Sequence, residues 1–168
     1  MQNAKDTFYE ALTSRIAAAN PERTIVLRGV VRPAVLAEEN ELVTAITIPD
    51  CFRLRWLDAT VDAANALPIA TLTCEVMYET AGTPGVGGLD RGRLLTEMDV
   101  ELTAAVNTCP QNVLKQSYAA LATGGSATAM TTNIWWSNVV LGPLVVKADR
   151  IGRTAKVTVM SCEEAGEL

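Results

Sequence analysis

Histidine is absent from the 168 residues of the sequence. This side chain transfers protons near neutral pH and completes the Ser-His-Asp and Cys-His arrangements of nucleophilic enzymes. It also ligates many zinc sites and the two-His iron sites. Its absence excludes these classes of active site and metal centre, and we predict that the protein is not an enzyme and uses no metal or cofactor.

Basic side chains are also scarce, since 14 Lys and Arg stand against 19 Asp and Glu, giving a net charge of −5. A surface that binds nucleic acid needs clustered basic side chains to displace counterions, and the sequence contains no basic run. The first residues lack the basic start and apolar core of a secretory signal. No apolar run approaches the about 20 residues that span a bilayer. We therefore expect a soluble protein, made in the cytoplasm, with neither membrane contact nor direct nucleic-acid recognition.

Closely spaced cysteines are missing too, so the chain has no C-x-x-C motif and no local metal knuckle. Widely separated cysteines in an apolar-rich chain are typical of small buried side chains in a reducing compartment. Two disulfides are also compatible with the number of cysteines. The four residues are Cys51, Cys74, Cys109 and Cys162.

The rest of the composition is typical of one globular domain, with 49% apolar and 20% charged residues. A chain of this length buries roughly 70% of the surface that it exposes when unfolded. We predict a single domain over residues 1–168, with a mobile glycine-rich loop at about 81–88 and an acidic C-terminal tail at about 163–168. We expect the acidic side chains of the tail, Glu163, Glu164 and Glu167, to be solvated at a frayed end.

The glycine-rich loop at 81–88 lies between a predicted strand and a predicted helix, the usual place of a phosphate-binding loop. It ends in Gly88-Leu89-Asp90, whereas a Walker loop ends in Gly-Lys-Ser/Thr. Asp90 also occupies the third glycine position of the dinucleotide-binding pattern and would repel a phosphate. We therefore interpret the loop as a mobile segment that becomes ordered on contact with a partner.

Apolar periodicity predicts two principal helices, at residues 5–20 and 90–107. In the first, apolar side chains recur at spacings of four, four and three, and Asn20-Pro21 ends the helix. In the second, Asp90 is the expected N-cap. Residues 58–68 remain ambiguous between a short helix and a loop.

Period-two alternation predicts the strands, most clearly at 69–80. Helices and strands do not alternate one for one, which disfavours a parallel doubly wound sheet. We predict an α+β fold, a mainly antiparallel sheet with two principal helices packed on one face. The expected strands are 24–28, 42–48, 52–57, 69–80, 129–140, 144–148 and 154–162.

Outward side chains on two strands are candidates for contacts with other subunits. Arg53 and Arg55 either pair with acidic residues of a neighbour or form a solvated strand face. Adjacent residues of a strand face opposite sides, so one of Trp135 and Trp136 is expected in the core and the other outward, unless the chain itself covers both. The predicted interface residues are Arg53, Arg55, Gly85, Gly87, Trp135 and Trp136.

Two sequence segments carry a resemblance to a known family. EVMYETAG at 75–82 precedes the glycine-rich loop, and LDRGRLL at 89–95 opens the second helix. Together with an N-terminal helix and a closing hairpin that ends at 154–161, this order resembles the tail-terminator and neck (head-tail joining) proteins of long-tailed bacteriophages and related prophages.

The resemblance implies a structural virion protein, a small α+β subunit that closes into a ring, typically a hexamer. The ring would cap the tail tube, end its growth and present a surface to the head-side connector, after assembly in the bacterial host cytoplasm. Its partners would be other copies of itself, the tail tube and the head-tail connector proteins. Two other classes stay open: a small-molecule-binding or regulatory dimer, and an enzyme that uses carboxylates without histidine.

Overall fold

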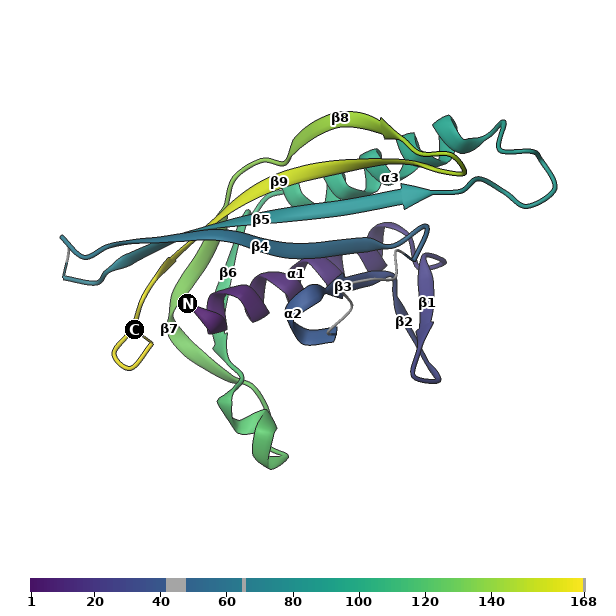
Figure 1. The fold of residues 1–168 in the computed structure, drawn as a ribbon. Coiled ribbons are helices and arrows are strands. Elements are labelled where there is room, and N and C mark those ends of the chain that lie inside the picture. Colours follow the sequence, from purple (N-terminus) through teal and green to yellow (C-terminus); the bar gives the residue numbers. More distant parts are fainter. Residues whose placement is uncertain (42–47, 65, 168) are drawn as a thin grey trace.

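Two helices cover one face of a curled, mainly antiparallel sheet (Figure 1). The computed structural model describes residues 1–41, 48–64 and 66–167. The helices are α1 (Gln2–Ala19), α2 (Glu38–Glu41) and α3 (Arg91–Asn107), with a 3-10 helix η1 at Ala119–Thr123. The strands are β1 (Thr24–Leu27), β2 (Val30–Pro33), β3 (Val35–Ala37), β4 (Phe52–Asp62), β5 (Ile69–Thr80), β6 (Asn112–Ser117), β7 (Thr128–Trp136), β8 (Val140–Val146) and β9 (Ile151–Cys162). The predicted α+β class is confirmed.

The main sheet has the strand order β3-β4-β5-β9-β7-β6. All its pairs are antiparallel except the short parallel pair β3–β4. Strands β7 and β8 share one side of β9, where β8 pairs with its first half and β7 with its end. Strands β1 and β2 form a separate hairpin, whose turn contains Arg28 and Gly29 at positive φ.

The ladder between β5 and β9 is the longest in the sheet. It runs without a break from the pair Ile69–Cys162 to the pair Thr80–Ile151. Alternate side chains of β5, among them Leu72 and Val76, are fully buried under the helices. This confirms the strand predicted at 69–80, whose period-two pattern is the clearest in the sequence.

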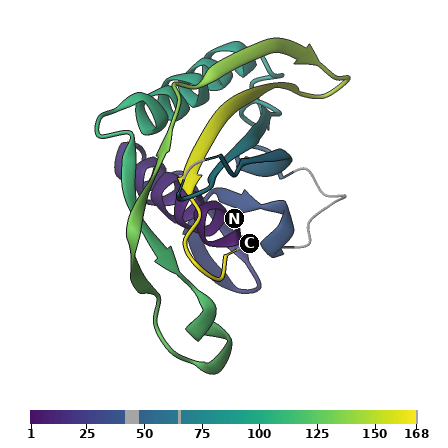
Figure 2. The same cartoon turned by 90° about the vertical axis from the view of Figure 1, so that its left-hand side faces the viewer.

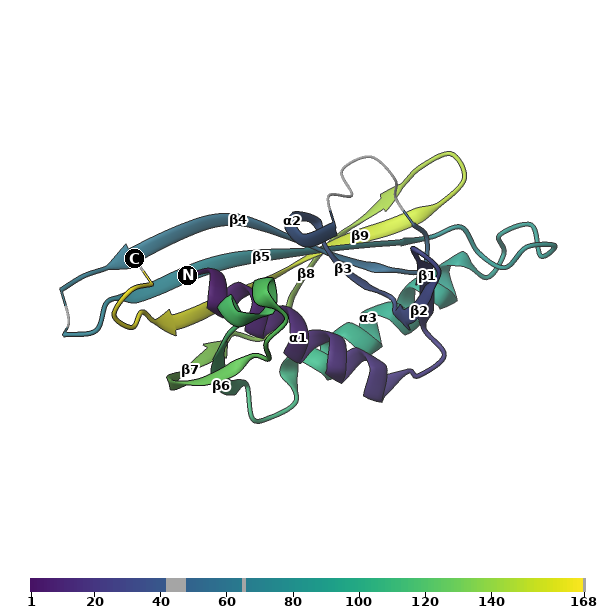
Figure 3. The same cartoon turned by 90° about the horizontal axis from the view of Figure 1, so that it is seen from below.

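Helix α1 buries the periodic side chains Phe8, Leu12 and Ile16, and begins three residues earlier than predicted. It ends where Asn20 adopts an extended conformation before Pro21. Helix α3 buries an equivalent stripe in the same core. Seen from below, both helices lie against the same side of the sheet (Figure 3).

The ends of the chain lie side by side (Figure 2). The N-terminal ammonium of Met1 pairs with Glu163, which is 1% exposed, and Glu164 accepts hydrogen bonds from the N–H groups of Thr131 and Thr132. The expectation that these acidic side chains are solvated is therefore wrong. The N-terminal ammonium holds Glu163, and the backbone N–H groups of β7 hold Glu164. These partners are distant in the sequence, so the local sequence does not indicate them.

Two further expectations changed in the structure. Within the ambiguous range 58–68, residues 58–62 form neither a helix nor a loop, because β4 continues through them as far as Asp62. The predicted strand at 42–48 falls outside the described residues apart from Ile48, which is not in a strand. Within the described residues, the structure contains no helix with the length and hydropathy needed to cross a membrane.

Candidate subunit-interaction surface

Large apolar side chains are exposed on edge and projecting elements of the fold. The best developed group lies on β8, where Val140 and Val146 are 67% and 71% exposed. Leu141, Leu144 and Val145 on the same strand are also exposed. Such a run of apolar side chains in water is typical of a surface that another molecule covers.

Strand β8 is an edge strand. It pairs with β9 on one side, and no strand among the described residues pairs with its other side. Its register shifts between Leu141 and Leu144, around Gly142-Pro143, and Arg153 donates a hydrogen bond to the Gly142 carbonyl. Proline has no N–H to offer to a neighbouring strand, so side chains rather than a regular ladder dominate what this edge presents.

The far end of the β4–β5 hairpin, described at residues 57–64 and 66–68, forms an arm that projects from the sheet (Figure 1). The register of β4 shifts between Trp56 and Ala59, and beyond that point every described residue through Leu67 is exposed. Leu57, Val61 and Leu67 expose about two fifths of their surface. The arm therefore offers apolar side chains without a core of its own.

The glycine-rich loop lies at the opposite end of β5 from the arm. Asp90 occupies the predicted N-cap position of α3, but its carboxylate makes no capping bond and instead accepts hydrogen bonds from the N–H and hydroxyl of Thr83. Arg91 donates to the carbonyl of Ala81. These bonds close the base of the loop, while Leu89 stays 91% exposed.

The predicted interface residues Gly85 and Gly87 lie in this loop. Both are exposed at positive φ, with open space where a Cβ would stand. Their role in a contact stays a prediction.

Arg53 and Arg55 are engaged within the chain. The Nε atoms of Arg53 and Arg55 lie 3.0 and 2.8 Å from the two carboxylate oxygens of Glu38 on α2. Arg53 is largely buried by this contact, whereas the side chain of Arg55 is 44% exposed. A neighbour would compete with Glu38 for both, which weakens the prediction that they pair across a subunit boundary.

The two tryptophans divide as expected between the faces of β7, and Trp136 is the inward one. It is 5% exposed, its Nε1 donates to the Val106 carbonyl at 2.9 Å, and its ring contacts Phe8 edge-on at 5.5 Å. Trp136 is therefore a core residue, and its assignment to an interface is wrong. Trp135 lies half-buried on the other face, opposite Met160.

A cavity of about 180 Å³ opens on the outer face of the sheet. Its apolar lining includes Cys51, and burial raises the pKa of that thiol to about 12. The charged groups at the cavity are already paired within the chain: Arg53 with Glu38, Arg153 with Asp99 and Lys147 with Glu79. The cavity therefore offers little unpaired charge to orient a bound molecule. A small-molecule-binding protein needs such polar groups in its pocket.

The carboxyl groups give equally little support to a carboxylate enzyme. Among those with a resolved pKa shift, burial raises the pKa of Asp6, whereas the pKa values of Glu79, Asp90, Asp149, Glu164 and Glu167 are lowered. Two carboxyl groups with raised pKa values facing each other in a cleft would support such an enzyme, and among the described carboxyl groups with a resolved shift Asp6 alone has a raised pKa. The described part of the chain also contains no group of three or more Asp, Glu or Cys placed to hold a metal ion.

No model of a known protein family matches the chain, and no curated protein matches it either. The surface itself therefore carries the functional argument. Sequence reasoning found the loop but missed β8 and the arm, because an apolar run such as VLGPLVV reads as core until the fold exposes it.

Proposed function

We propose that the protein is a structural assembly subunit, a ring-forming tail terminator or neck protein of a long-tailed bacteriophage or prophage. In this role the ring caps the tail tube and joins it to the head connector. The observation that carries the proposal is β8, an edge strand that pairs with β9 on one side only among the described residues and has five exposed apolar side chains. A soluble monomer rarely keeps such a strand uncovered, whereas a subunit of an assembly covers it with a neighbour.

Three features support assembly over ligand binding. Four of the five exposed apolar side chains of β8 lie outside the cavity, which Val145 helps to line. The arm and β8 differ in shape and composition, as the two halves of a heterologous contact do, and a heterologous contact forms a ring when its rotation closes. The α+β fold, with its mainly antiparallel sheet and two helices on one face, is the fold that the family resemblance implies.

The test uses the purified protein alone and with purified tail tubes of a long-tailed bacteriophage. Light scattering on a sizing column across a range of concentrations gives the subunit number. Electron microscopy of the tubes then shows whether a ring sits at one end. We expect a discrete multi-subunit species, free or at the tube end, and tubes that stop growing once it is added. A protein that leaves tube length unchanged and never occupies a tube end would refute the proposal.

A further inference from the structure

Lys115 on β6 is fully buried, whereas the side chains of the other three lysines reach solvent. Its ammonium nitrogen donates to the hydroxyl of Ser161 at 3.2 Å, to the carbonyl of Cys162 and to the carboxylate of Glu167 at 2.6 Å. The proposed assembly function does not use this group. A lysine nitrogen shielded from water is also a nucleophile, so its surroundings determine what it can react with.

The carboxylate of Glu167 joins this amine to a carboxamide. Its Oε2 lies 2.6 Å from Nζ of Lys115, and its Oε1 accepts a hydrogen bond from Nδ2 of Asn3 at 3.1 Å. The side chain of Glu167 is 5% exposed. An amine and a carboxamide therefore share the two oxygens of one nearly buried carboxylate.

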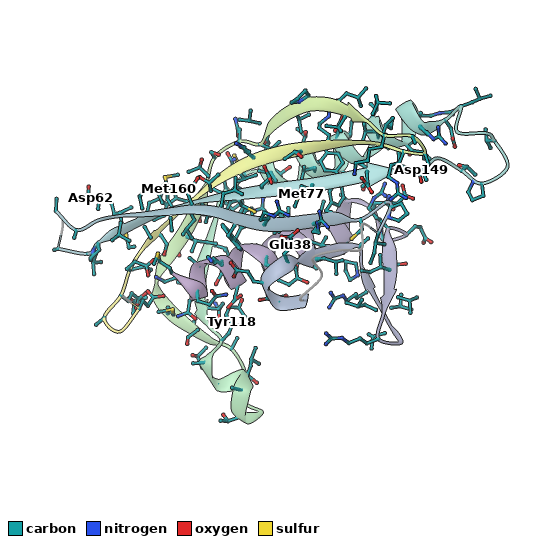
Figure 4. All side chains as sticks on the ribbon, viewed as in Figure 1. Glu38, Asp62, Met77, Tyr118, Asp149 and Met160 are labelled. Atoms are coloured by element: carbon teal, nitrogen blue, oxygen red, sulfur yellow. The ribbon has the colours of Figure 1, made fainter. Side chains whose placement is uncertain are left out.

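The carboxamide of Asn3 is held against β6 by its other end. Asn3 lies in the first turn of α1, and its Oδ1 accepts a hydrogen bond from the N–H of Tyr118, directly after β6, at 3.4 Å. One turn further along α1, the hydroxyl of Thr7 accepts a bond from the N–H of Gln116 at 3.0 Å. Figure 4 labels Tyr118 close to the start of α1. These bonds place the Asn3 amide beside the stretch of β6 that contains Lys115.

We propose that Lys115 and Asn3 form an intramolecular amide, an isopeptide bond, with Glu167 as the acid and base of the reaction. Rotation of the half-buried Asn3 side chain brings its Cγ to Nζ of Lys115. A C–N bond forms between these two atoms, the Cγ–Nδ2 bond of Asn3 breaks, and ammonia leaves. The reaction needs no oxidant, reductant or other co-reactant. Its product joins α1 to β6 covalently.

Glu167 touches both nitrogen atoms that exchange protons. Its carboxylate takes one proton from the ammonium of Lys115, and burial favours the resulting neutral pair because charged groups lose their hydration there. The two remaining N–H groups bind Ser161 and Cys162, so the lone pair faces the side on which Glu167 lies. Glu167 then gives its proton to Nδ2 of Asn3 and accepts the second proton of the attacking nitrogen. That second proton departs with the ammonia, which leaves as ammonium.

The oxygen on which negative charge develops already has a donor. The N–H of Tyr118 binds Oδ1 of Asn3, and this bond strengthens as the attack turns the carbonyl oxygen into an oxyanion. The fold also holds the amine and the amide in one site, which replaces a bimolecular encounter by an intramolecular step.

A direct amide between Lys115 and Glu167 is less favourable. Loss of water from Glu167 needs an acid that protonates the departing oxygen. The remaining partners of Lys115 are the hydroxyl of Ser161 and the carbonyl of Cys162, and neither is such an acid. Asn3 has its acid in Glu167, which makes Asn3 the electrophile.

The first experiment is the intact mass of the purified full chain in denaturant, measured fresh and after a week at room temperature. We expect a mass below that calculated from the sequence by one ammonia. Trypsin does not cleave after a modified lysine, so the digest should contain a branched peptide that joins residues 1–5 to residues 94–147. A chain that keeps its calculated mass at both times, with cleavage after Lys115, would overturn the proposal.

Three variants identify the reacting groups. Lys115→Arg, Asn3→Ala and Glu167→Gln should each keep the mass calculated for that variant. The controls Lys5→Arg and Glu164→Gln change the same residue types elsewhere and should lose ammonia as the parent does. Asparagine and glutamine side chains also lose ammonia by cyclising on the backbone, but that reaction does not require a lysine. A loss of ammonia that persists in Lys115→Arg would therefore refute the link.

The remaining outcomes are equally distinct. Loss of water instead of ammonia would indicate an amide between Lys115 and Glu167 and would overturn the assignment of Asn3. Asn3→Ala removes the electrophile but keeps the ion pair of Lys115 with Glu167, so it is also the unlinked background in which that pair is measured by itself. The mass measurement does not depend on tail tubes or on ring formation, and either proposal can fail while the other stands.

Discussion

The ammonium nitrogen of Lys115 on β6 lies 2.6 Å from a carboxylate oxygen of Glu167, near the end of the chain, and both side chains are nearly fully buried. Lys115 also donates to the hydroxyl of Ser161 and to the carbonyl of Cys162. These bonds fasten residues 163–167 against the sheet. A lysine without water depends on such partners, because burial of an unpaired charge is costly.

We predict that Lys115→Ala lowers the free energy of unfolding by about 3–5 kcal/mol, because it leaves the Glu167 carboxylate buried without its partner. Lys115→Met combined with Glu167→Leu should recover most of the loss. The control is Lys5→Ala, which breaks the more exposed pair with Glu39 and should cost less than about 1 kcal/mol. Urea denaturation of the four proteins measures the differences. Equal losses for Lys115→Ala and Lys5→Ala would contradict the buried-pair account.

Two glycines should respond to alanine in opposite directions. At Gly152 on β9 a Cβ would lie 2.7 Å from the carbonyl oxygen of Tyr78, so Gly152→Ala should destabilise the protein by about 1–3 kcal/mol. At Gly92 in the first turn of α3 a Cβ meets nothing within 4 Å. Gly92→Ala should be neutral or stabilise by up to about 1 kcal/mol. Thermal melts of the two variants, with the parent as reference, test the sign of each change.

Stability should fall in acid. Hydrogen bonds from Thr132 and Thr131 lower the pKa of Glu164 from 4.5 to about 2. Burial opposes ionisation of Glu79 and Glu167, but hydrogen bonds from Lys147 and Lys115, respectively, outweigh it and lower both pKa values. A carboxyl group with a lowered folded-state pKa stabilises the fold above its unfolded pKa, and that contribution disappears as the pH falls through the folded value.

The window of this loss lies below about pH 4.5 and extends to about pH 2. Denaturant midpoints measured from about pH 6 downward should be constant at first and then decline through that window. Glu164→Gln should flatten part of the decline. A midpoint that rises on acidification would contradict the prediction.

The base of the glycine-rich loop should depend on Asp90. Asp90→Ala removes the acceptor of both Thr83 bonds, so amide hydrogen exchange in residues 82–90 should accelerate while the core ladder keeps its protection. Asp90→Asn keeps one acceptor oxygen and should show a smaller effect. Exchange measured by mass spectrometry reports both regions in one experiment, and uniform acceleration across the chain would indicate global destabilisation instead.

The sequence predicted the elements whose burial follows a strict period. Strand β5 buries every side chain of its predicted inward face, and helix α1 buries its predicted stripe except for Ala19, which is exposed at the end of the helix. The contacts between residues far apart in the chain produce no recognisable pattern in the neighbouring sequence. Nothing near Glu163 indicates that the N-terminal ammonium lies beside it, and nothing near Asp90 indicates that Thr83 competes for its carboxylate.

The candidate surface was harder to predict for a related reason. Exposure of β8 depends on its position at the edge of β9 rather than on its composition, which is that of a buried strand. The arm alternates too weakly for period analysis, since its described residues have no buried face. Its acidic character, in contrast, is visible in the sequence once its projection from the fold is known.

The unbroken β5–β9 ladder joins both ends of the molecule in one stiff body. The two ends of the molecule are therefore held at a relative angle that is set by the twist of this ladder and not by a hinge. Shortening both strands by a matched pair of residues would rotate one end of the molecule relative to the other.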